Sequence, residues 1–381
     1  MQELLQGIMG FNLGQMIMMV IGGLLIYLAI AKDYEPMLLL PIGFGAILAN
    51  IPFSSAIGAD GFLSVLYNAG IKNELFPVLI FIAVGAMIDF GPLLQNPFML
   101  FFGAAAQFGI FATMIASLFL GGWLKDLGLN INIGLKEAAS IGIIGAADGP
   151  TSIYVANKFA KDLLAPISVA AYSYMSLVPI IQPPVIKFLT SKRERLIRME
   201  THEIKIPKIV KILFPIMVTV VAGIVAPISV ALVGSLMFGN LIRECGVLER
   251  LSKAAQSELA NLVTLLLGIT IGSTMVAEKF LNPATILIMA LGLIAFVFDT
   301  AGGVLFAKLL NLFLKRKVNP MVGAAGISAF PMSARVIQRM AQKEDPTNFV
   351  LMQAVSANVA GQLGSIVAGG LLLAIVPALL K

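Results

Sequence analysis

The chain has 381 residues, of which 59% are hydrophobic and only 12% are charged, with a formal net charge of +6. Soluble domains carry about 25% charged residues, so this composition excludes an ordinary soluble domain and predicts an integral membrane protein. One cysteine, Cys245, excludes an internal disulfide and any cysteine-based metal cluster. Basic residues in such a chain mostly report orientation in the membrane, and we therefore expect no nucleic-acid partner.

Apolar segments of about 20 residues, the length that crosses a hydrocarbon core, recur along the chain. The first, at 11–31, is too long for the apolar region of a signal peptide, and we expect it to be retained. Hydropathy and helix breakers predict two series of five spans. The first series is 11–31, 36–52, 74–94, 97–121 and 162–188, and the second is 209–233, 234–249, 257–276, 283–312 and 348–379.

Between the fourth and fifth span of each series lies a stretch of small residues that is too polar and too broken for an ordinary span. These stretches, 134–161 and 319–343, share a Gly-Ala-Ala tripeptide, and we interpret both as re-entrant helical hairpins. Five crossings per series is an odd number, so the second series would be inverted. The sequence thus predicts an all-α polytopic membrane protein with two inverted repeats, 1–190 and 209–381, as in secondary transporters.

The segment that joins the two predicted repeats, 191–208, is strongly basic. Because positively charged loops stay on the cytoplasmic side, we predict a cytoplasmic linker and an N-terminus outside. On this topology the first hairpin enters the membrane from outside and the second from the cytoplasm. The only histidine, His202, lies in this linker, so histidine-based metal binding or catalysis has no support.

Asp148 is the main candidate site residue, because it lies at the break of the first hairpin. Gly149 frees the backbone there, and a proline follows that is suited to open the next half-helix. A carboxylate inside a membrane costs about 2.5–3.5 kcal/mol, so it is a functional candidate by default. Sodium takes oxygen ligands, to which Thr151 and Ser152 could add hydroxyls. The alternative is that Asp148 caps the following helix, which would not exclude ion binding.

The second hairpin offers a further set of polar positions. Asn319 and Gly323 are four residues apart and share a helix face, while Pro331 breaks the helix near Ser328. Arg335 would lie on the cytoplasmic arm, where its planar guanidinium suits a bidentate grip on a carboxylate. An interfacial anchor is the alternative for Arg335.

Three positions outside the hairpins are weaker candidates. Tyr174, in the span 162–188, could relay a proton or orient a ligand, and the alternative is packing. Asn358 is an amide on a glycine-rich face, where small residues could simply permit close helix contact. Asp299 is a possible ion-pathway residue. The Pro183-Pro184 pair predicts a kink near the end of the span that contains Tyr174.

Together these motifs resemble the beta subunit of the sodium-pumping, biotin-dependent decarboxylases of oxaloacetate, methylmalonyl-CoA and glutaconyl-CoA. The resemblance covers nearly the whole chain and is most specific in four segments: GAADGPTS at 145–152, AYSYMSLVPIIQPP at 171–184, the segment 319–335, and NVAGQLGS at 358–365. Motifs of this length in this order are far more specific than a short pattern.

The resemblance implies that the chain decarboxylates carboxybiotin, presented by a partner's carrier domain, and couples this reaction to outward Na+ transport. It implies a location in the inner membrane of a prokaryote and three partners: a carboxyltransferase alpha subunit, a biotin carrier protein and a small single-span gamma or delta subunit. We also expect a homo-oligomer within the complex. The chain is short for the oxaloacetate type, which mildly favours an acyl-CoA decarboxylase.

The resemblance also assigns roles to individual residues. The family's essential aspartate corresponds to Asp148 and its functional tyrosine to Tyr174. The family's other polar and glycine positions correspond to Asn319, Gly323, Ser328, Arg335 and Asn358. The implied catalytic residues are Asp148, Tyr174 and Arg335; the implied carboxybiotin contacts are Arg335 and Ser328; the implied Na+ ligands are Asp148, Asn319, Gly323, Ser328 and Asn358. The competing interpretation is a sodium- or proton-coupled carrier of a small carboxylate without enzymatic activity.

Overall fold

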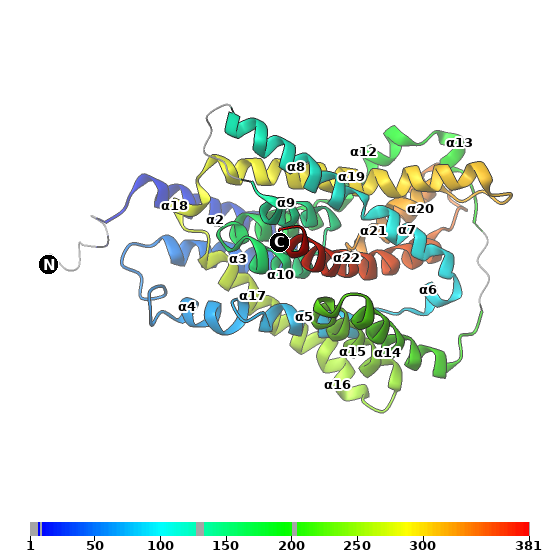
Figure 1. The fold of residues 1–381 in the computed structure, drawn as a ribbon, viewed down its shortest axis with the longest axis horizontal. Coiled ribbons are helices and arrows are strands. Elements are labelled where there is room, and N and C mark those ends of the chain that lie inside the picture. Colours follow the sequence, from blue (N-terminus) through cyan, green and yellow to red (C-terminus); the bar gives the residue numbers. More distant parts are fainter. Residues whose placement is uncertain (1–6, 8–9, 127–132, 200–203, 381) are drawn as a thin grey trace.

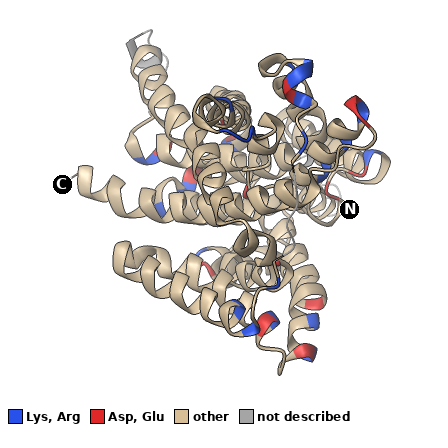
Figure 2. Cartoon of the chain, turned by 90° about the vertical axis from the view of Figure 1, so that its right-hand side faces the viewer, with Lys and Arg blue, Asp and Glu red and all other residues tan. Residues whose placement is uncertain are grey.

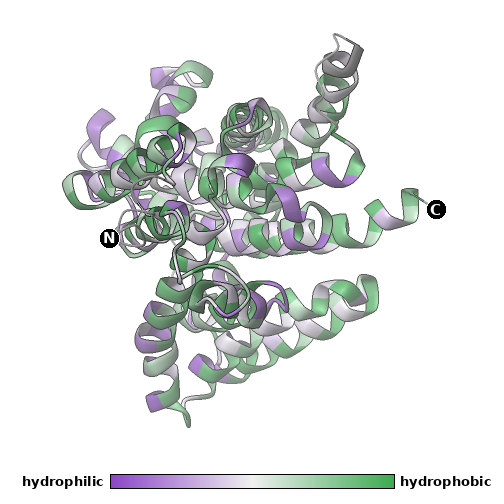
Figure 3. Ribbon diagram, turned by 90° about the vertical axis from the view of Figure 1, so that its left-hand side faces the viewer, coloured by the Kyte–Doolittle hydropathy of each residue, from purple (hydrophilic) through white to green (hydrophobic). Residues whose placement is uncertain are grey.

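The computed structural model describes all residues except 1–6, 8–9, 127–132, 200–203 and 381, so His202 lies outside the described residues. The described part is mainly helical and contains no β-strand. Seven of its helices are long and apolar enough to cross a membrane, or up to nine if each of two bent pairs forms one span. Apolar positions follow most of these helices (Figure 3). The predicted all-α polytopic membrane fold is confirmed.

The helices up to residue 126 form the first part of the bundle (Figure 1). They are α2 (Leu13–Lys32), α3 (Pro36–Asn50), α4 (Phe62–Leu66), the π-helix η1 (Tyr67–Ile71), α5 (Leu75–Met87), α6 (Gly91–Gln95), the short 3-10 turn η2 (Pro97–Met99), α7 (Leu100–Ala106) and α8 (Phe108–Asp126). The first broken hairpin consists of α9 (Leu135–Gly142), η3 (Ile143–Ala146) and α10 (Gly149–Phe159). The helices that follow it are η4 (Lys161–Leu163), α11 (Leu164–Ser176), α12 (Val178–Leu189) and α13 (Lys192–Arg195).

The remaining helices repeat several of these features. They are α14 (Lys208–Val225), η5 (Pro227–Ser229), α15 (Val230–Cys245), α16 (Glu249–Ala254), the π-helix η6 (Ala255–Leu259), α17 (Ala260–Ser273), α18 (Ala277–Phe280) and α19 (Pro283–Phe313). The second broken hairpin is α20 (Pro320–Ala324) and α21 (Met332–Glu344), and α22 (Leu351–Leu379) follows it. Both predicted hairpins are therefore present as broken helices.

Several predicted bounds and one predicted kink are wrong, and the clearest cases follow. The helix break placed at residue 233 lies at Ala226, because Pro227 starts a new turn there. The span predicted at 74–94 leaves out residues 62–71. These residues form a helix that is bent by 62° relative to α5, and the two pass as one candidate span. The kink expected at the Pro183-Pro184 pair lies earlier, between α11 and α12, which are bent by 69°. Pro179 occupies the second position of α12, where its missing N–H would have no partner anyway.

The helices pack in two groups, which meet along a common interface. In the first group α3 packs against α2 and α17, and α5 packs against α15 and α17, while α14 covers α15. In the second group the long α19 contacts α7, α8, α11, α12 and α20, and α22 contacts α7 and α21. The groups meet where α10 touches α5, α11 touches α3 and α17, and α22 touches α15. Both broken hairpins belong to the second group, beside this interface (Figure 1).

Charged residues are sparse on the helices, so the few buried ones stand out (Figure 2). Asp148 and Asp299 are 3% and 0% exposed, respectively. The Oδ1 of Asp299 accepts a hydrogen bond from the backbone N–H of Ile110, 3.1 Å away, in the first turn of α8. Asp299 therefore caps the start of a neighbouring helix with one of its carboxylate oxygens. Its other oxygen, Oδ2, is buried without a hydrogen-bond partner among the described residues.

Candidate functional site

The break of the first hairpin positions Asp148. Ala147 takes a left-handed backbone conformation that ends η3, and Asp148 is extended and caps α10. Its Oδ1 accepts a hydrogen bond from the backbone N–H of Thr151 at 3.2 Å. The capping role considered from the sequence is therefore confirmed. It uses only one of the two carboxylate oxygens.

The other oxygen of Asp148 faces α22. Its Oδ2 accepts hydrogen bonds from Gln362 Nε2 at 3.0 Å and from Ser365 Oγ at 2.7 Å. Sequence reasoning did not assign either donor, although both belong to the segment 358–365. Their three-residue spacing puts them on one face of α22. Polar side chains that share a face of a membrane helix are functional candidates, and this pattern could have identified both residues from the sequence. The final helix of the chain thus supports the carboxylate of the first hairpin.

The breaks of the two hairpins are in direct contact. The backbone N–H of Ser328 donates to the carbonyl oxygen of Ala146 at 3.0 Å, next to Asp148. Ser328 Oγ donates to the carbonyl oxygen of Gly361 at 2.9 Å. Asn358 Nδ2 donates to the carbonyl oxygen of Ile327 at 2.6 Å, and its Oδ1 is buried without a hydrogen-bond partner among the described residues. The structure therefore places Ser328 and Asn358 at the break of the second hairpin, which contacts the first hairpin two residues before Asp148.

A cavity of about 270 Å³ opens beside these breaks, at the interface between the two helix groups. Asp148, Ser328 and Gln362 line one side of it. Glu35, in the loop between α2 and α3, lies on another side, where burial raises the pKa of its carboxyl. Other lining residues are Phe81, Tyr172, Met175, Gln256, Asn261, Thr264, Phe330 and Pro331. Carboxylate, hydroxyl and amide oxygens are therefore available around one small space.

Arg335 lies one helical turn beyond the cavity. Pro331 lines the cavity, and Arg335 follows it by four residues on α21, with its side chain exposed. An exposed guanidinium at this position can meet an anion while its charge stays solvated.

Two neighbouring tyrosines, Tyr172 and Tyr174, lie on α11. Tyr174 was the candidate from the sequence, but the structure places Tyr172 at the cavity. The Tyr174 hydroxyl donates to the carbonyl oxygen of Met289 on α19, and Tyr174 does not line the cavity. Tyr172 does, is 2% exposed, and its hydroxyl has no hydrogen-bond partner among the described residues. Its ring fits against Gly149, where a Cβ would overlap it. Two residues along a helix change the face, so sequence alone could not choose between the two tyrosines.

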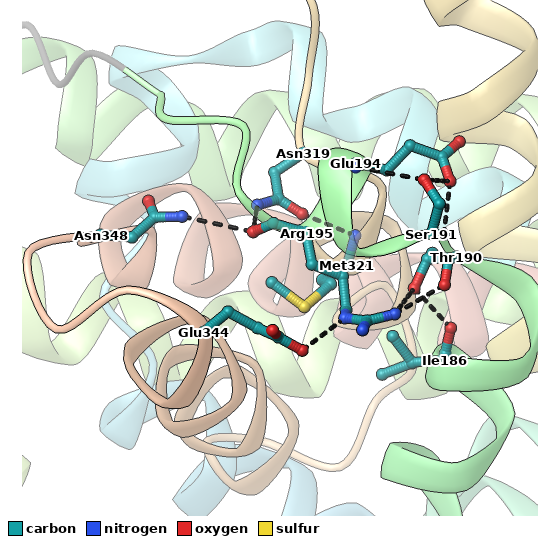
Figure 4. Close-up of polar contacts among 9 residues, drawn as sticks. All are labelled: Ile186, Thr190, Ser191, Glu194, Arg195, Asn319, Met321, Glu344 and Asn348. Atoms are coloured by element: carbon teal, nitrogen blue, oxygen red, sulfur yellow. Dashed lines mark hydrogen bonds and ion pairs between the residues drawn. The ribbon is translucent and has the colours of Figure 1, made fainter.

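Asn319 lies at a joint between the second hairpin and the linker (Figure 4). Its Oδ1 caps α20 by accepting from the backbone N–H of Met321, and its Nδ2 donates to the carbonyl oxygens of Arg195 and Ile197, both at 2.9 Å. Asn348, just beyond α21, donates to the same two carbonyls at 3.3 and 3.4 Å. Asn319 is not among the residues that line the cavity. The two amides hold the linker to both ends of the hairpin.

Ion pairs reinforce this joint. Arg195 Nε lies 2.7 Å from Glu344 Oε1, and Arg198 Nη2 lies 2.7 Å from Asp345 Oδ2. Hydrogen bonding by Thr347, followed by Arg198, lowers the pKa of Asp345 to about 2. The carboxylate of Asp345 therefore stays charged at neutral pH and keeps its ion pair with Arg198.

Gly323 is where α20 touches α19. A Cβ on Gly323 would overlap the carbonyl oxygen of Gly303, and a Cβ on Gly303 would overlap that of Gly323. Neither backbone can move away easily, because both helices are packed in the buried core. Close contact between helices thus accounts for Gly323, which does not line the cavity.

Replacing Gly323 with alanine is expected to destabilise the chain by about 1–3 kcal/mol, because the added methyl meets backbone rather than a flexible side chain. Thermal unfolding in detergent would measure the change. Gly303→Ala should reproduce it, whereas Gly23→Ala, where nothing lies within 4 Å, should not. Unchanged stability combined with weakened Na+ binding would instead assign Gly323 to the ion site.

Among the described residues no group of three or more His, Cys, Asp or Glu could hold a metal ion. A transition-metal centre therefore has no basis in this part of the chain. One carboxylate surrounded by hydroxyl, amide and freed backbone oxygens is instead the donor set that hard monovalent cations accept in membrane transporters.

Comparison with known proteins shows which family the chain belongs to. Residues 14–376 match the model of the Na+-transporting oxaloacetate decarboxylase beta subunit family. The chain belongs to this family. It is 48% identical to the methylmalonyl-CoA decarboxylase subunit beta of Propionigenium modestum over 393 aligned positions, covering 97% of this chain and 96% of that one.

Two further relatives match the chain over a similar share of its length. The glutaconyl-CoA decarboxylase subunit beta of Acidaminococcus fermentans is 50% identical over 370 positions, with 97% and 95% of the two chains covered. The oxaloacetate decarboxylase beta chain 2 of Salmonella typhimurium is 45% identical over 422 positions, with 96% of each covered. The chain is thus a beta subunit of a Na+-transporting decarboxylase, and nothing in these relationships supports the alternative of a plain carboxylate carrier.

Proposed function

We propose that this beta subunit releases CO2 from carboxybiotin at a cavity that faces the cytoplasm, and that it couples this reaction to outward movement of Na+. The observation that carries the proposal is the contact between the two helix breaks, with the buried carboxylate of Asp148 at the junction and an open cavity beside it. Half-helix ends and a carboxylate at one point are the elements of an ion site in transporters.

The architecture proposed for this function is a pair of inverted repeats, 1–190 and 209–381, joined by the linker 191–208. In support, α2, α3 and the pair η1–α5 have counterparts in α14, α15 and the pair η6–α17, with a π-helix before the last helix in each case. The packing is reciprocal: α3 contacts α17, and α15 contacts α5. Motion of one helix group against the other would then expose the cavity to alternate sides.

For the substrate, we propose that Arg335 pairs with the carboxylate of carboxybiotin at the entrance and that Ser328 contacts the ring. The cavity is slightly smaller than the about 300–1,000 Å³ of typical small-molecule sites, so it would accept the ring end of biotin and not its arm. Loss of CO2 leaves an anionic ureido nitrogen that takes up a proton. Because the Tyr174 hydroxyl is already bonded to Met289, we assign Tyr174 to holding α11 against α19.

For the cargo, we propose Asp148, Ser328 and Asn358 as the centre of the Na+ site, since these three residues lie at the two breaks, which contact each other. Asn319 and Gly323 would act through the second hairpin, by holding it to the linker and to α19. Moving one charge against 100 mV costs about 2.3 kcal/mol. Decarboxylation must therefore favour the state that opens to the outside.

The proposed setting is the inner membrane of a prokaryote, with the N-terminus outside and the linker in the cytoplasm. The proposed partners are a carboxyltransferase alpha subunit, a biotin carrier protein and a small single-span gamma or delta subunit, in a complex with more than one beta copy. An acyl-CoA substrate is favoured, because the acyl-CoA decarboxylase relatives are 48% and 50% identical to the chain and the oxaloacetate relative is 45% identical.

The test is a simultaneous measurement of reaction and transport. The purified complex in liposomes is supplied with carboxybiotin, and CO2 release and ²²Na+ movement are recorded together. We expect CO2 release to require Na+ and the tracer to cross the membrane in proportion to it. Carboxybiotin decarboxylation without Na+ dependence or tracer movement would contradict the proposal, and biotin-independent uptake of a carboxylate would point to a carrier.

A further inference from the structure

Another pocket, of about 550 Å³, lies at the end of the long helix α19, next to α13 in the linker (Figure 1). This volume is within the range of about 300–1,000 Å³ that is typical of small-molecule sites. The pocket shares no lining residue with the cavity at the helix breaks, so it is a separate candidate site. Its lining residues are Arg193, Glu194, Ile197, Lys308, Leu309, Asn311, Leu312 and Lys317.

The two segments that form this pocket are strongly basic. Residues 191–198 and 308–317 together contain eight lysines and arginines and one acidic residue, Glu194. The carboxylate of Glu194 accepts hydrogen bonds from Ser191 and lies 3.2 Å from the Nζ of Lys308. The one acidic side chain in the lining is therefore already paired, and the pocket keeps an excess of positive charge.

Two cations of the pocket have no counter-charge. Arg193 has an exposed side chain and forms no ion pair among the described contacts. Lys317 is also exposed, and its Nζ donates to the backbone carbonyl oxygen of Asn311, which carries no net charge. Guanidinium and ammonium groups are the usual protein partners of phosphate groups. The polar part of the pocket therefore suits a ligand that carries a phosphate.

Apolar side chains complete the lining of the pocket. Leu309 and Leu312 belong to it and are 53% and 75% exposed. They lie in the last turns of α19, a helix long and apolar enough to cross a membrane. The apolar run ends at Leu314, directly before the three basic residues 315–317. The pocket therefore lies at the level where the hydrocarbon of a bilayer meets its headgroups.

We propose that this pocket binds an anionic phospholipid from the leaflet on the linker side, with its phosphate at Arg193 and Lys317 and an acyl chain along Leu309 and Leu312. Basic pockets at the membrane ends of transmembrane helices are known to hold acidic lipid headgroups. A soluble anion or an acidic protein would leave both leucines without a partner. The bound lipid holds the linker against the end of α19, next to the joint formed by Asn319.

The test measures the binding of phosphatidylglycerol to the purified full chain in detergent by native mass spectrometry. We expect phosphatidylglycerol to bind at least about tenfold more tightly than zwitterionic phosphatidylcholine. Arg193→Gln and Lys317→Gln should each weaken phosphatidylglycerol binding about fivefold, the usual effect of one basic residue near the headgroups. Lys192→Gln is the matched control and should stay within about twofold, because Lys192 is exposed beside Arg193 but does not line the pocket.

Four results would overturn the proposal. Equal binding of the two lipids would remove the selectivity for an anionic headgroup, and unchanged binding in both Arg193→Gln and Lys317→Gln would remove the phosphate contacts. An equal loss in Lys192→Gln and Arg193→Gln would assign the effect to the general charge of this surface. Displacement of the lipid by an equal concentration of soluble glycerol phosphate would show a site for free phosphate, in which the leucines take no part.

Discussion

Asp148→Asn is expected to reduce Na+-dependent decarboxylation of free carboxybiotin at least about 100-fold, which corresponds to about 3 kcal/mol of lost stabilisation. The change removes the negative charge that neutralises the cation in a site that is 3% exposed. Asparagine caps helices as well as aspartate does, so the bond to Thr151 and the start of α10 should survive. Activity is measured with the purified complex and free carboxybiotin over a series of Na+ concentrations.

A control separates the charge of Asp148 from its hydrogen bonds. Ser365→Ala removes one donor to Oδ2 and leaves the carboxylate charged. It should weaken apparent Na+ affinity about 10-fold, the effect of about 1.4 kcal/mol, and leave the rate at saturating Na+ nearly unchanged. Full activity in Asp148→Asn would refute the assignment of the ion to this carboxylate, whatever the control shows.

Arg335→Ala is expected to lower kcat/KM for carboxybiotin about 100-fold while Na+ binding stays unchanged, since a bidentate charged hydrogen bond is worth about 1.5–3 kcal/mol. Arg335→Lys should recover only part of the loss, because an ammonium cannot grip a carboxylate with two parallel bonds. Steady-state kinetics on free carboxybiotin, together with ²²Na+ binding, would measure both effects.

Arg339 offers a matched comparison, because it is one turn further along α21 and is also exposed. Arg339→Ala should leave kcat/KM within about twofold of the unmodified protein, as surface substitutions usually do. If both arginine variants lost activity equally, a general effect of positive charge at this surface would replace the specific contact. Unchanged turnover in Arg335→Ala would remove Arg335 from the mechanism.

Local signals in the sequence were sufficient to predict the membrane fold and the positions of the helix breaks. The length of an apolar run is set by the thickness of the bilayer, so most spans could be predicted. The bounds of α19 were predicted to within one residue and those of α22 to within three. Glycine and proline change the conformation of the backbone at their own position. Gly149 and the proline after it were therefore enough to predict the helix break at Asp148. The boundary at Ala226 was missed because a second apolar run continues directly after it, without a change in hydropathy.

What lies next to Asp148 was decided by the tertiary structure alone. Its donors Gln362 and Ser365 are 214 and 217 residues away in the chain, and no local pattern relates such distant positions. The same holds for Asn319, whose amide holds the linker, and for the choice of Tyr172 over Tyr174. Each depends on which faces of two separate helices meet. The sequence by itself therefore determined which residues are polar inside the membrane, and packing determined which of them share a site.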